Sequence, residues 1–401
     1  MENLPTAVSK TIPTPTENPT RSLPEIFNSF SEARKNGFLA VKKLKDQGLG
    51  VVGVFCTYTP VEIFLAAGLI PVGLCSTSDE TIPEAEKTLP RNLCPLIKAS
   101  YGFAITDKCP YMYFSDLVVG ETTCDGKKKM YELLGRFKDV YVMELPQSQT
   151  RPWAHEIWLS EIRRLKERVE EKFGLVITNE KLSGAIRERN LERAYLKELY
   201  ELSILSPPPL TGLTQLSLLF GVQYKFDHQS KIKEIKEIIA KLKQSYEIGA
   251  RPVPASAKRI IITGCPMGGV TEKVTRVIEE SNGVVVAYEN CTGAKQMDRQ
   301  IRENGDPWKA LAEHYLGLGC AVMTPNLARL ELLGRLCQQF SADGVIEMTL
   351  TACQPYAVES TTVHNFFRDR NLPFLTLETD YSTGDLEQLR TRAAAFLETL
   401  P

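Results

Sequence analysis

Asp116-Leu117-Val118-Val119-Gly120-Glu121-Thr122-Thr123-Cys124-Asp125-Gly126 is the stretch of sequence from which the fold can be worked out. Its apolar residues 117–119 are typical of a short buried parallel strand, and residues 127–134 have the spacing of a helix. Cys124 is therefore expected at the carboxyl end of a strand, where open α/β sheets bind their ligands.

Three other cysteines stand at the same point of a predicted strand. Cys56 follows residues 51–55, Cys75 follows residues 69–74, and Cys353 follows residues 345–351. Because the carboxyl ends of parallel strands lie at one edge of a sheet, the sequence predicts that these thiols gather there.

The composition is that of an ordinary globular protein. The 401 residues are enough for two or more domains, and 48 Lys and Arg nearly balance 49 Asp and Glu. This balance gives no reason to expect binding to nucleic acid or to an anionic membrane. No run of residues approaches the ~20 apolar positions of a membrane span. Since the polar start of the chain does not resemble a signal peptide, we expect a cytoplasmic protein.

The ten cysteines need an explanation other than disulfides, because cytosolic thiols stay reduced. No Cys-x-x-Cys pair occurs, which argues against a zinc ribbon and a thioredoxin motif. A metal site in this chain would therefore have to be assembled by the fold and not by a single loop.

The chain divides into four predicted parts. Residues 1–24, with five Pro and five Thr, are expected to form a mobile arm. Residues 25–150 and 256–401 alternate strands and helices, whereas residues 151–250 are predicted to be long amphipathic helices. We predict an α/β protein with two similar doubly wound parallel-sheet domains and a helical insert or bridge between them.

The predicted topology selects among the cysteines. Cys94 begins a predicted helix. Cys109 lies beyond the far end of that helix and is therefore expected at the opposite edge of the sheet, so we exclude it as a ligand of the same site. Cys320 precedes a predicted helix at 326–340, which places it on the same rim as Cys353. Six cysteines are thus predicted to converge in a cleft between the halves: Cys56, Cys75, Cys94, Cys124, Cys320 and Cys353. Cys265 and Cys291 remain possible lining residues, and Cys337 is assigned to the core.

Thiolates are soft ligands that suit zinc and iron–sulfur clusters, and six are too many for one zinc ion. We therefore expect one or two iron–sulfur clusters; the alternative for any single cysteine is packing as a small buried apolar residue. Glu121 and Asp125 flank Cys124 and are candidate catalytic groups that relay protons, with surface capping as the alternative.

Three further features are assigned no role in the site. Residues 264–271 nearly match a phosphate-binding loop, but Val270 stands where the lysine is required, so we expect a tight turn and a separate protein to hydrolyse any ATP. Residues 127–129 are three lysines predicted to form a solvated helix face. The four histidines are scattered and are predicted to lie at the surface or in the core.

Three motifs carry a resemblance to a known family. Cys94-Pro95, Cys124-Asp125-Gly126-Lys127-Lys128 and Cys353-Gln354-Pro355-Tyr356 resemble the cluster-ligand motifs of the 2-hydroxyacyl-CoA dehydratase and benzoyl-CoA reductase family. The likeness extends from residues 58–68 to about residue 392. Residues 92–98, 120–129 and 378–382 look like the double-cubane cluster proteins of that family.

The resemblance implies a homodimer in which each subunit holds two four-iron four-sulfur cubanes joined by a bridging sulfide (8Fe-9S). It also implies a separate iron–sulfur ATPase that supplies low-potential electrons for the reduction of small molecules. Cys94, Cys124 and Cys353 match the shared motifs, and Cys56, Cys75 and Cys320 are inferred for the remaining positions.

Three functions follow from these expectations. The first is an ATP-dependent reductase component that reduces a small substrate in the cleft. The second is a subunit of a 2-hydroxyacyl-CoA dehydratase with one four-iron cluster. The third is an electron-storage protein without a substrate of its own.

Overall fold

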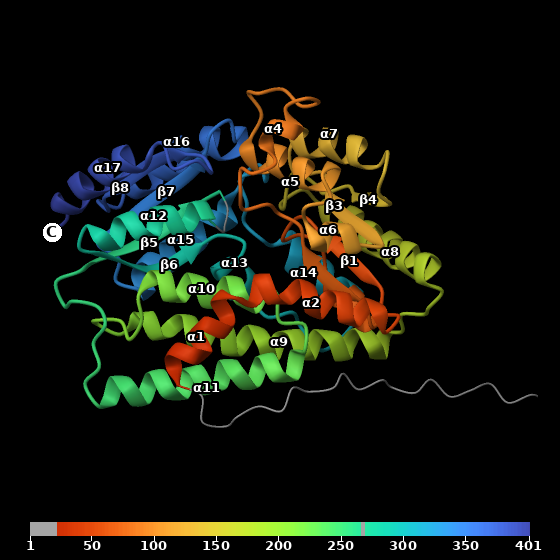
Figure 1. Cartoon of the computed structure of the whole chain (residues 1–401), viewed down its shortest axis with the longest axis horizontal. Coiled ribbons are helices and arrows are strands. Elements are labelled where there is room, and N and C mark those ends of the chain that lie inside the picture. Colours follow the sequence, from red (N-terminus) through yellow and green to blue (C-terminus); the bar gives the residue numbers. More distant parts are fainter. Residues whose placement is uncertain (1–21, 266–268) are drawn as a thin grey trace, which may run out of the picture.

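The computed structural model describes residues 22–265 and 269–401. Its two four-stranded sheets, both parallel throughout, confirm the predicted α/β class with two similar halves (Figure 1). The predicted arm lies almost entirely outside the described residues, and helix α1 begins at Leu23.

The first sheet has the strand order β2-β1-β3-β4. Its strands are β1 (Val51–Val54), β2 (Ile70–Gly73), β3 (Leu117–Glu121) and β4 (Val140–Met143). All five residues of β3 are buried. This burial on both faces explains the continuous apolar run in the sequence, since helices cover both sides of such a sheet.

The second sheet repeats this order as β6-β5-β7-β8. Its strands are β5 (Lys258–Gly264), β6 (Gly283–Glu289), β7 (Gly344–Leu350) and β8 (Phe374–Thr379). In each half the chain therefore runs first through an inner strand, then to the edge strand beside it, and then back across to the other side. Strand β5 corresponds to β1, β6 to β2 and β7 to β3.

The first half contains α1 (Leu23–Ser31), α2 (Ala33–Asp46), α3 (Glu62–Ala66), α4 (Ile82–Ala85), α5 (Pro95–Ile105), α6 (Pro110–Phe114) and α7 (Asp125–Leu134). Helices α1 and α2 meet at Glu32, which caps the end of the first and the start of the second. Ser22 and Glu25 form a capping box that fixes the start of α1.

The predicted helical insert consists of α8 (Ala154–Phe173), α9 (Asn179–Glu201), α10 (Gly212–Val222) and α11 (His228–Glu247), with a short 3-10 helix at Leu202–Ile204. In Figure 1, α9 and α11 run side by side at the bottom of the molecule, and α9 extends beneath both sheets. The insert therefore packs against both halves and also connects them in sequence.

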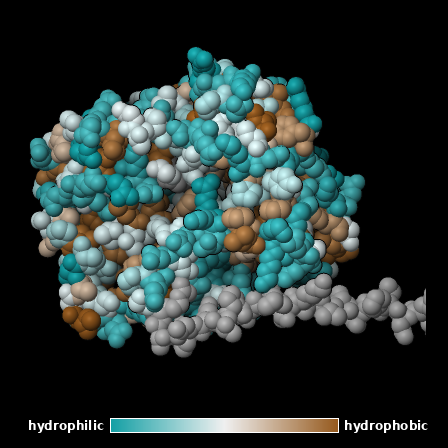
Figure 2. Space-filling view, viewed as in Figure 1, coloured by the Kyte–Doolittle hydropathy of each residue, from teal (hydrophilic) through white to brown (hydrophobic). Residues whose placement is uncertain are grey.

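The second half contains α12 (Gly269–Glu280), α13 (Ala294–Met297), α14 (Pro307–Leu316), α15 (Leu327–Gln339), α16 (Gln354–Arg368) and α17 (Leu386–Glu398). Helix α14 packs against α8 and α9 of the insert, so the halves are joined through a common helical layer. Figure 2 shows hydrophilic side chains over much of one face of the molecule, which is hollowed near its middle. Within the described residues, none of the helices has the length and apolar character needed to cross a bilayer.

Candidate functional site

A cavity of about 880 Å³ lies at the carboxyl edges of the two sheets, and the insert forms part of its wall. All ten cysteines belong to the described residues, and all are free thiols. Eight of them line this cavity: Cys56, Cys75, Cys94, Cys124, Cys265, Cys291, Cys320 and Cys353. Thiols that are far apart in the sequence are therefore brought to one place.

The two halves present their thiols at matching points of the fold. Cys56 and Cys265 follow the corresponding strands β1 and β5, Cys75 and Cys291 follow β2 and β6, and Cys124 and Cys353 follow β3 and β7. Cys94 and Cys320 both lie in the connection between the second and third strand of their half. The eight thiols thus form two sets of four that are related by the internal repeat.

The structure brings all six predicted cysteines to the cavity and adds two that the sequence left open, Cys265 and Cys291. Cys109 precedes α6 and borders a separate small hollow, so it does not line the cavity. Cys337 lies in α15, partly buried against the core. The internal repeat is the signal that could have assigned Cys265 and Cys291, because each is the counterpart of a cysteine already chosen.

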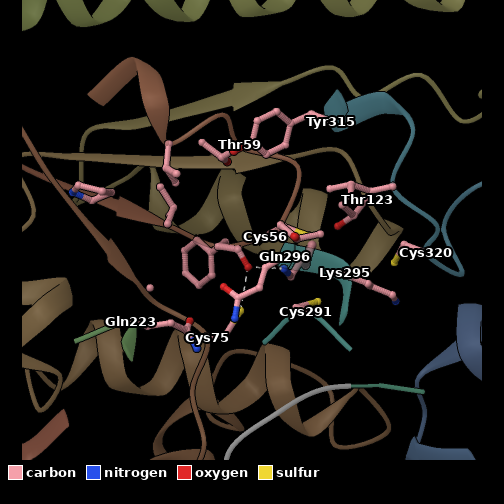
Figure 3. Close-up of a pocket in the computed structure, with 18 of the residues that line it drawn as sticks. Cys56, Thr59, Cys75, Thr123, Gln223, Cys291, Lys295, Gln296, Tyr315 and Cys320 are labelled. Atoms are coloured by element: carbon pink, nitrogen blue, oxygen red, sulfur yellow. Dashed lines mark hydrogen bonds between the residues drawn. The ribbon is translucent and has the colours of Figure 1, made fainter. Parts of the chain in front are cut away.

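Three sulfur atoms are close to one another at the junction of the halves. Cys353 Sγ lies 3.6 Å from Cys265 Sγ, and the Cys94 side chain is also hydrogen-bonded to Cys353. Figure 3 shows Cys56, Cys75, Cys291 and Cys320 around another part of the cavity. Of these, Cys75 donates its S–H to the Phe55 carbonyl at 2.8 Å.

Burial keeps these thiols protonated. It raises the pKa of Cys291 to about 12 and also raises the pKa of Cys56, Cys75 and Cys124. A buried thiol gives up its proton when a metal takes its place, since metal binding replaces the proton and supplies the positive charge. The donor set therefore suits a metal group with several soft coordination sites.

Within the described ranges, no group of three or more His, Cys, Asp or Glu side chains converges on a point that one metal ion could occupy. A four-iron cluster makes a different demand, because its cysteine ligands bind separate irons at the corners of the cluster. Thiols spread around a large cavity fit this second arrangement of ligands.

The two candidate acids differ sharply in their surroundings. The Glu121 side chain is wholly buried, and burial raises its pKa to about 7, while a hydrogen bond from the Thr59 hydroxyl opposes this effect. Its Oε2 has no hydrogen-bond partner among the described residues. Asp125 is on the cavity rim, but its side chain is 95% exposed and pairs with Lys128 at 2.7 Å. Glu121 is thus the candidate that can hold a proton inside the protein.

Two buried lysines line the cavity, and the sequence missed both. Lys127 was expected on a solvated helix face, and this was wrong: the residue is 8% exposed and its Nζ donates to the Phe55 carbonyl at 3.1 Å. Lys295 lies beside Cys291 and Cys320 in Figure 3 and pairs with Glu289 at 3.0 Å. Burial acts to lower the pKa of Lys295, but the Glu289 carboxylate together with Cys320 and Cys291 outweighs it, so the pKa lies above its usual value.

A buried ionic network forms the wall on the side of the insert. Glu62 of α3 accepts a hydrogen bond from Arg193 of α9 at 2.6 Å and another from the Tyr315 hydroxyl at 2.6 Å. Arg189 pairs with Glu192 at 2.6 Å. Burial acts to raise the pKa of Glu62, but Arg193 and Arg189 outweigh it, so the net pKa is lowered.

Two of the four histidines also line the cavity, His228 at the start of α11 and His314 in α14. His314 is buried, and burial followed by the nearby Arg193 lowers its pKa to about 3. His155 and His364 are exposed, in line with the surface prediction. The segment that resembles a phosphate-binding loop includes residues 266–268, which lie outside the described residues.

Comparison with known proteins shows to which family this chain is similar. The family model for the D-component of 2-hydroxyglutaryl-CoA dehydratase matches residues 56–400. The chain is 52% identical over 379 residues to YjiM of Escherichia coli (strain K12), provisionally named a dehydratase subunit, covering 94% of this chain and 98% of that protein.

The names of more distant relatives state an enzymatic activity. The chain is 24% identical to the (R)-phenyllactyl-CoA dehydratase beta subunit of Clostridium sporogenes, covering 94% of this chain and 99% of that protein. It is 21% identical to a benzoyl-CoA reductase subunit of Thauera aromatica, covering 90% of this chain and 94% of that protein. Since the family model spans most of the chain, this protein belongs to the family of the 2-hydroxyglutaryl-CoA dehydratase D-component, whose members include dehydratase and reductase subunits.

Proposed function

We propose that this chain is the iron–sulfur component of an ATP-dependent reductase. In this proposal, it holds two four-iron four-sulfur cubanes joined by a sulfide and works as a homodimer in the cytoplasm. It accepts low-potential electrons from a separate iron–sulfur ATPase and passes them to a small molecule in the cavity. The observation that carries the proposal is the convergence of thiols from both halves on one large cavity.

The residues at the cavity suit such a group. Cys94, Cys124 and Cys353 would hold one cubane, and Cys56, Cys75 and Cys320 are proposed for the other. Cys291 lies in the part of the cavity that Figure 3 shows, together with Cys56, Cys75 and Cys320. It is therefore the first alternative to Cys75 as a ligand. With three thiols for each cubane, six of the cavity cysteines would be needed to hold the group.

When bound, the cluster supplies the electrons, and the protein supplies binding, exclusion of water and protons. Glu121 is fully buried next to Thr59 and can hold a proton near neutral pH, as the reduction of most small molecules requires. Lys127 and Lys295 keep positive charge at the wall of the cavity. Asp125, with its exposed side chain, remains a candidate only for proton exchange at the rim.

The proposed partner accounts for the source of energy. The chain has Val270 where a phosphate-binding loop needs its lysine, so ATP hydrolysis is assigned to the separate ATPase. The charged network of Glu62, Arg189 and Arg193 joins the halves through the insert and would hold the cavity walls in register during electron transfer.

A second candidate function is that of a 2-hydroxyacyl-CoA dehydratase subunit with one four-iron cluster. The names of several relatives favour it, such as the phenyllactyl-CoA dehydratase subunit at 24% identity. Under this alternative only Cys94, Cys124 and Cys353 would bind iron, and the other five cavity thiols would serve in packing.

The iron content per chain distinguishes the double-cubane reductase from the dehydratase subunit. The protein should be purified without oxygen, reconstituted, and analysed for iron, sulfide and electron paramagnetic resonance. About eight irons per chain support the double cubane, about four support the dehydratase, and none would end both proposals. Reduction of the bound group by the ATPase partner, with ATP and without it, then tests the electron source. If the group is reduced but no compound from a panel of small unsaturated molecules and 2-hydroxyacyl-CoA thioesters is converted, electron storage replaces the enzyme.

A further inference from the structure

Lys127 is unusual among the buried lysines of the described chain. It lies in the first turn of α7, three residues after Cys124, and lines the cysteine cavity. The buried lysines Lys98, Lys231 and Lys295 each pair with a carboxylate, at 2.8, 2.9 and 3.0 Å. Within the described residues, no ion pair joins a carboxylate to the Lys127 ammonium; the buried Glu121 acts on it only from beyond ion-pairing distance.

The contacts of Lys127 do not balance its charge. Its Nζ donates one hydrogen bond to the Phe55 carbonyl at 3.1 Å and lies 5.7 Å from the centre of the Phe55 ring. Both partners are neutral. Burying an ammonium without a counter-charge costs several kcal/mol in a folded protein, so buried charges are almost always paired or face an ion.

The position of Lys127 indicates what its counter-charge is. Phe55, its hydrogen-bond partner, directly precedes Cys56, and the same carbonyl accepts the S–H of Cys75 at 2.8 Å. The ammonium thus shares one acceptor with a cavity thiol and lies beside two of the sulfurs. A group held by thiolates at these positions would bring negative charge next to an ammonium that has no ion-pair partner of its own.

We propose that Lys127 is the counter-charge of the iron–sulfur group held by the cavity cysteines and that it raises the reduction potential of this group. This inference rests on the proposed function. Because reduction adds a negative charge at the cavity, a nearby ammonium in a low-dielectric wall favours the reduced state. Lys127 is therefore a positioning residue that acts through the cluster and does not itself react.

The test compares Lys127→Met and Lys127→Arg with Lys128→Met. Lys128 lies on the same helix, but its side chain is 38% exposed and it pairs with Asp125, so it serves as the matched surface control. Each variant is purified without oxygen, its iron is counted, and its midpoint potential is measured by a redox titration followed by electron paramagnetic resonance. We expect Lys127→Met to have a more negative midpoint, whereas Lys127→Arg and Lys128→Met stay at the wild-type value.

The unfolding of the metal-free full-length chain provides a second measurement. A lysine that only supports the fold would make Lys127→Met less stable than wild type in the absence of iron. A counter-charge predicts an unchanged or higher unfolding midpoint, because the substitution removes a buried charge that forms no ion pair in the metal-free chain. This readout also holds if Lys127→Met fails to assemble a cluster.

The outcomes are distinct. Equal midpoint potentials in iron-loaded wild type and Lys127→Met overturn the inference and leave the proposed function in place. A lower unfolding midpoint for metal-free Lys127→Met overturns it as well. Wild-type protein that takes up no iron overturns the proposed function, and the inference is overturned with it.

Discussion

Cys353 Sγ lies 3.6 Å from Cys265 Sγ at the end of the second sheet, and Cys94 of the first half is hydrogen-bonded to the same Cys353. The two cysteines of the second half follow the neighbouring strands β7 and β5. This contact shows that the topology, and not a local sequence motif, brings the thiols together. It also shows that Cys94 and Cys353, two proposed ligands of one cubane, lie close to Cys265, a thiol that the proposed ligand set does not use.

The cavity cysteines should differ from the other cysteines in their effect on iron. We expect Cys94→Ser, Cys124→Ser and Cys353→Ser each to lose at least half of the bound iron, because a serine hydroxyl is a harder and weaker ligand for iron than a thiolate. Cys109→Ser and Cys337→Ser are the controls, since neither side chain lines the cavity. The measurement is iron and sulfide per chain after anaerobic reconstitution. Equal iron in all five variants would contradict the ligand assignment.

The counterparts Cys75 and Cys291 offer a matched comparison for the second cubane. Each follows the edge strand of its half by two residues, yet the Cys75 thiol donates to a backbone carbonyl. The ligand assignment predicts that Cys75→Ser lowers the iron content to about half and that Cys291→Ser leaves it near the wild-type value. The reverse result would exchange these two residues in the assignment and keep the double cubane.

Substitutions of Glu121 and of Asp125 should have different effects on the rate of substrate reduction. Glu121→Gln keeps a side chain of similar shape that can accept the Thr59 hydrogen bond, but it removes the titratable proton. We expect the rate of substrate reduction to fall about 100-fold, in the usual range for the loss of a general acid or base, while the iron content stays unchanged. Asp125→Asn should retain most of the rate because its carboxylate is exposed. A Glu121→Gln protein as active as wild type would remove this residue from the proton path.

Much of this fold could be predicted from the sequence because its strands carry a clear local signal. The runs at residues 117–121 and 344–350 are mainly apolar and buried on both faces, and a cysteine follows each of them. The strand-helix alternation then fixes the carboxyl edge, which is why Cys56, Cys124 and Cys353 could be expected to lie close together.

The residues that the sequence missed carry no such local signal. Lys127 belongs to a run of three lysines, and only the packing of α7 against Phe55 distinguishes it from its exposed neighbours. Arg193 is one of many charged residues on α9, and its buried partner Glu62 is 131 residues away in the chain. Long-range pairing of this kind cannot be read from spacing, since either residue alone is typical of a solvated helix face.

The pair Glu62–Arg193 should contribute strongly to stability. Its side chains are 0% and 3% exposed, and it joins α3 of the first half to α9 of the insert. Glu62→Gln leaves the arginine buried without its counter-charge, so we expect a loss of about 3 kcal/mol in the free energy of unfolding. Asp46→Asn, which breaks the exposed pair with Lys42, should cost less than about 0.5 kcal/mol. Chemical denaturation of the two variants side by side checks this, and similar losses in both would contradict it.

His314 should make the stability of the protein depend on pH. Its folded-state pKa is lowered to about 3, first by burial and then by Arg193, and its Nδ1 has no hydrogen-bond partner among the described residues. In the unfolded chain a histidine titrates near ~6.5. Between these values the unfolded state binds the proton and the folded state does not, so the free energy of unfolding falls as the pH drops from about 6.5 towards 3.

This contribution of His314 can be isolated with a substitution. A pKa difference of this size corresponds to a loss of up to about 4 kcal/mol across the whole range, and roughly 40% of it should be visible between pH 6.5 and pH 5. His314→Gln removes the titrating group, so its urea midpoint should change less over this range than that of the wild type. His155→Gln, at an exposed position, should follow the wild type. If His314→Gln loses stability on acidification as steeply as wild type, the acid sensitivity arises elsewhere, and the buried carboxylate Glu62, whose lowered pKa gives it the same sign of pH dependence, is the next group to substitute.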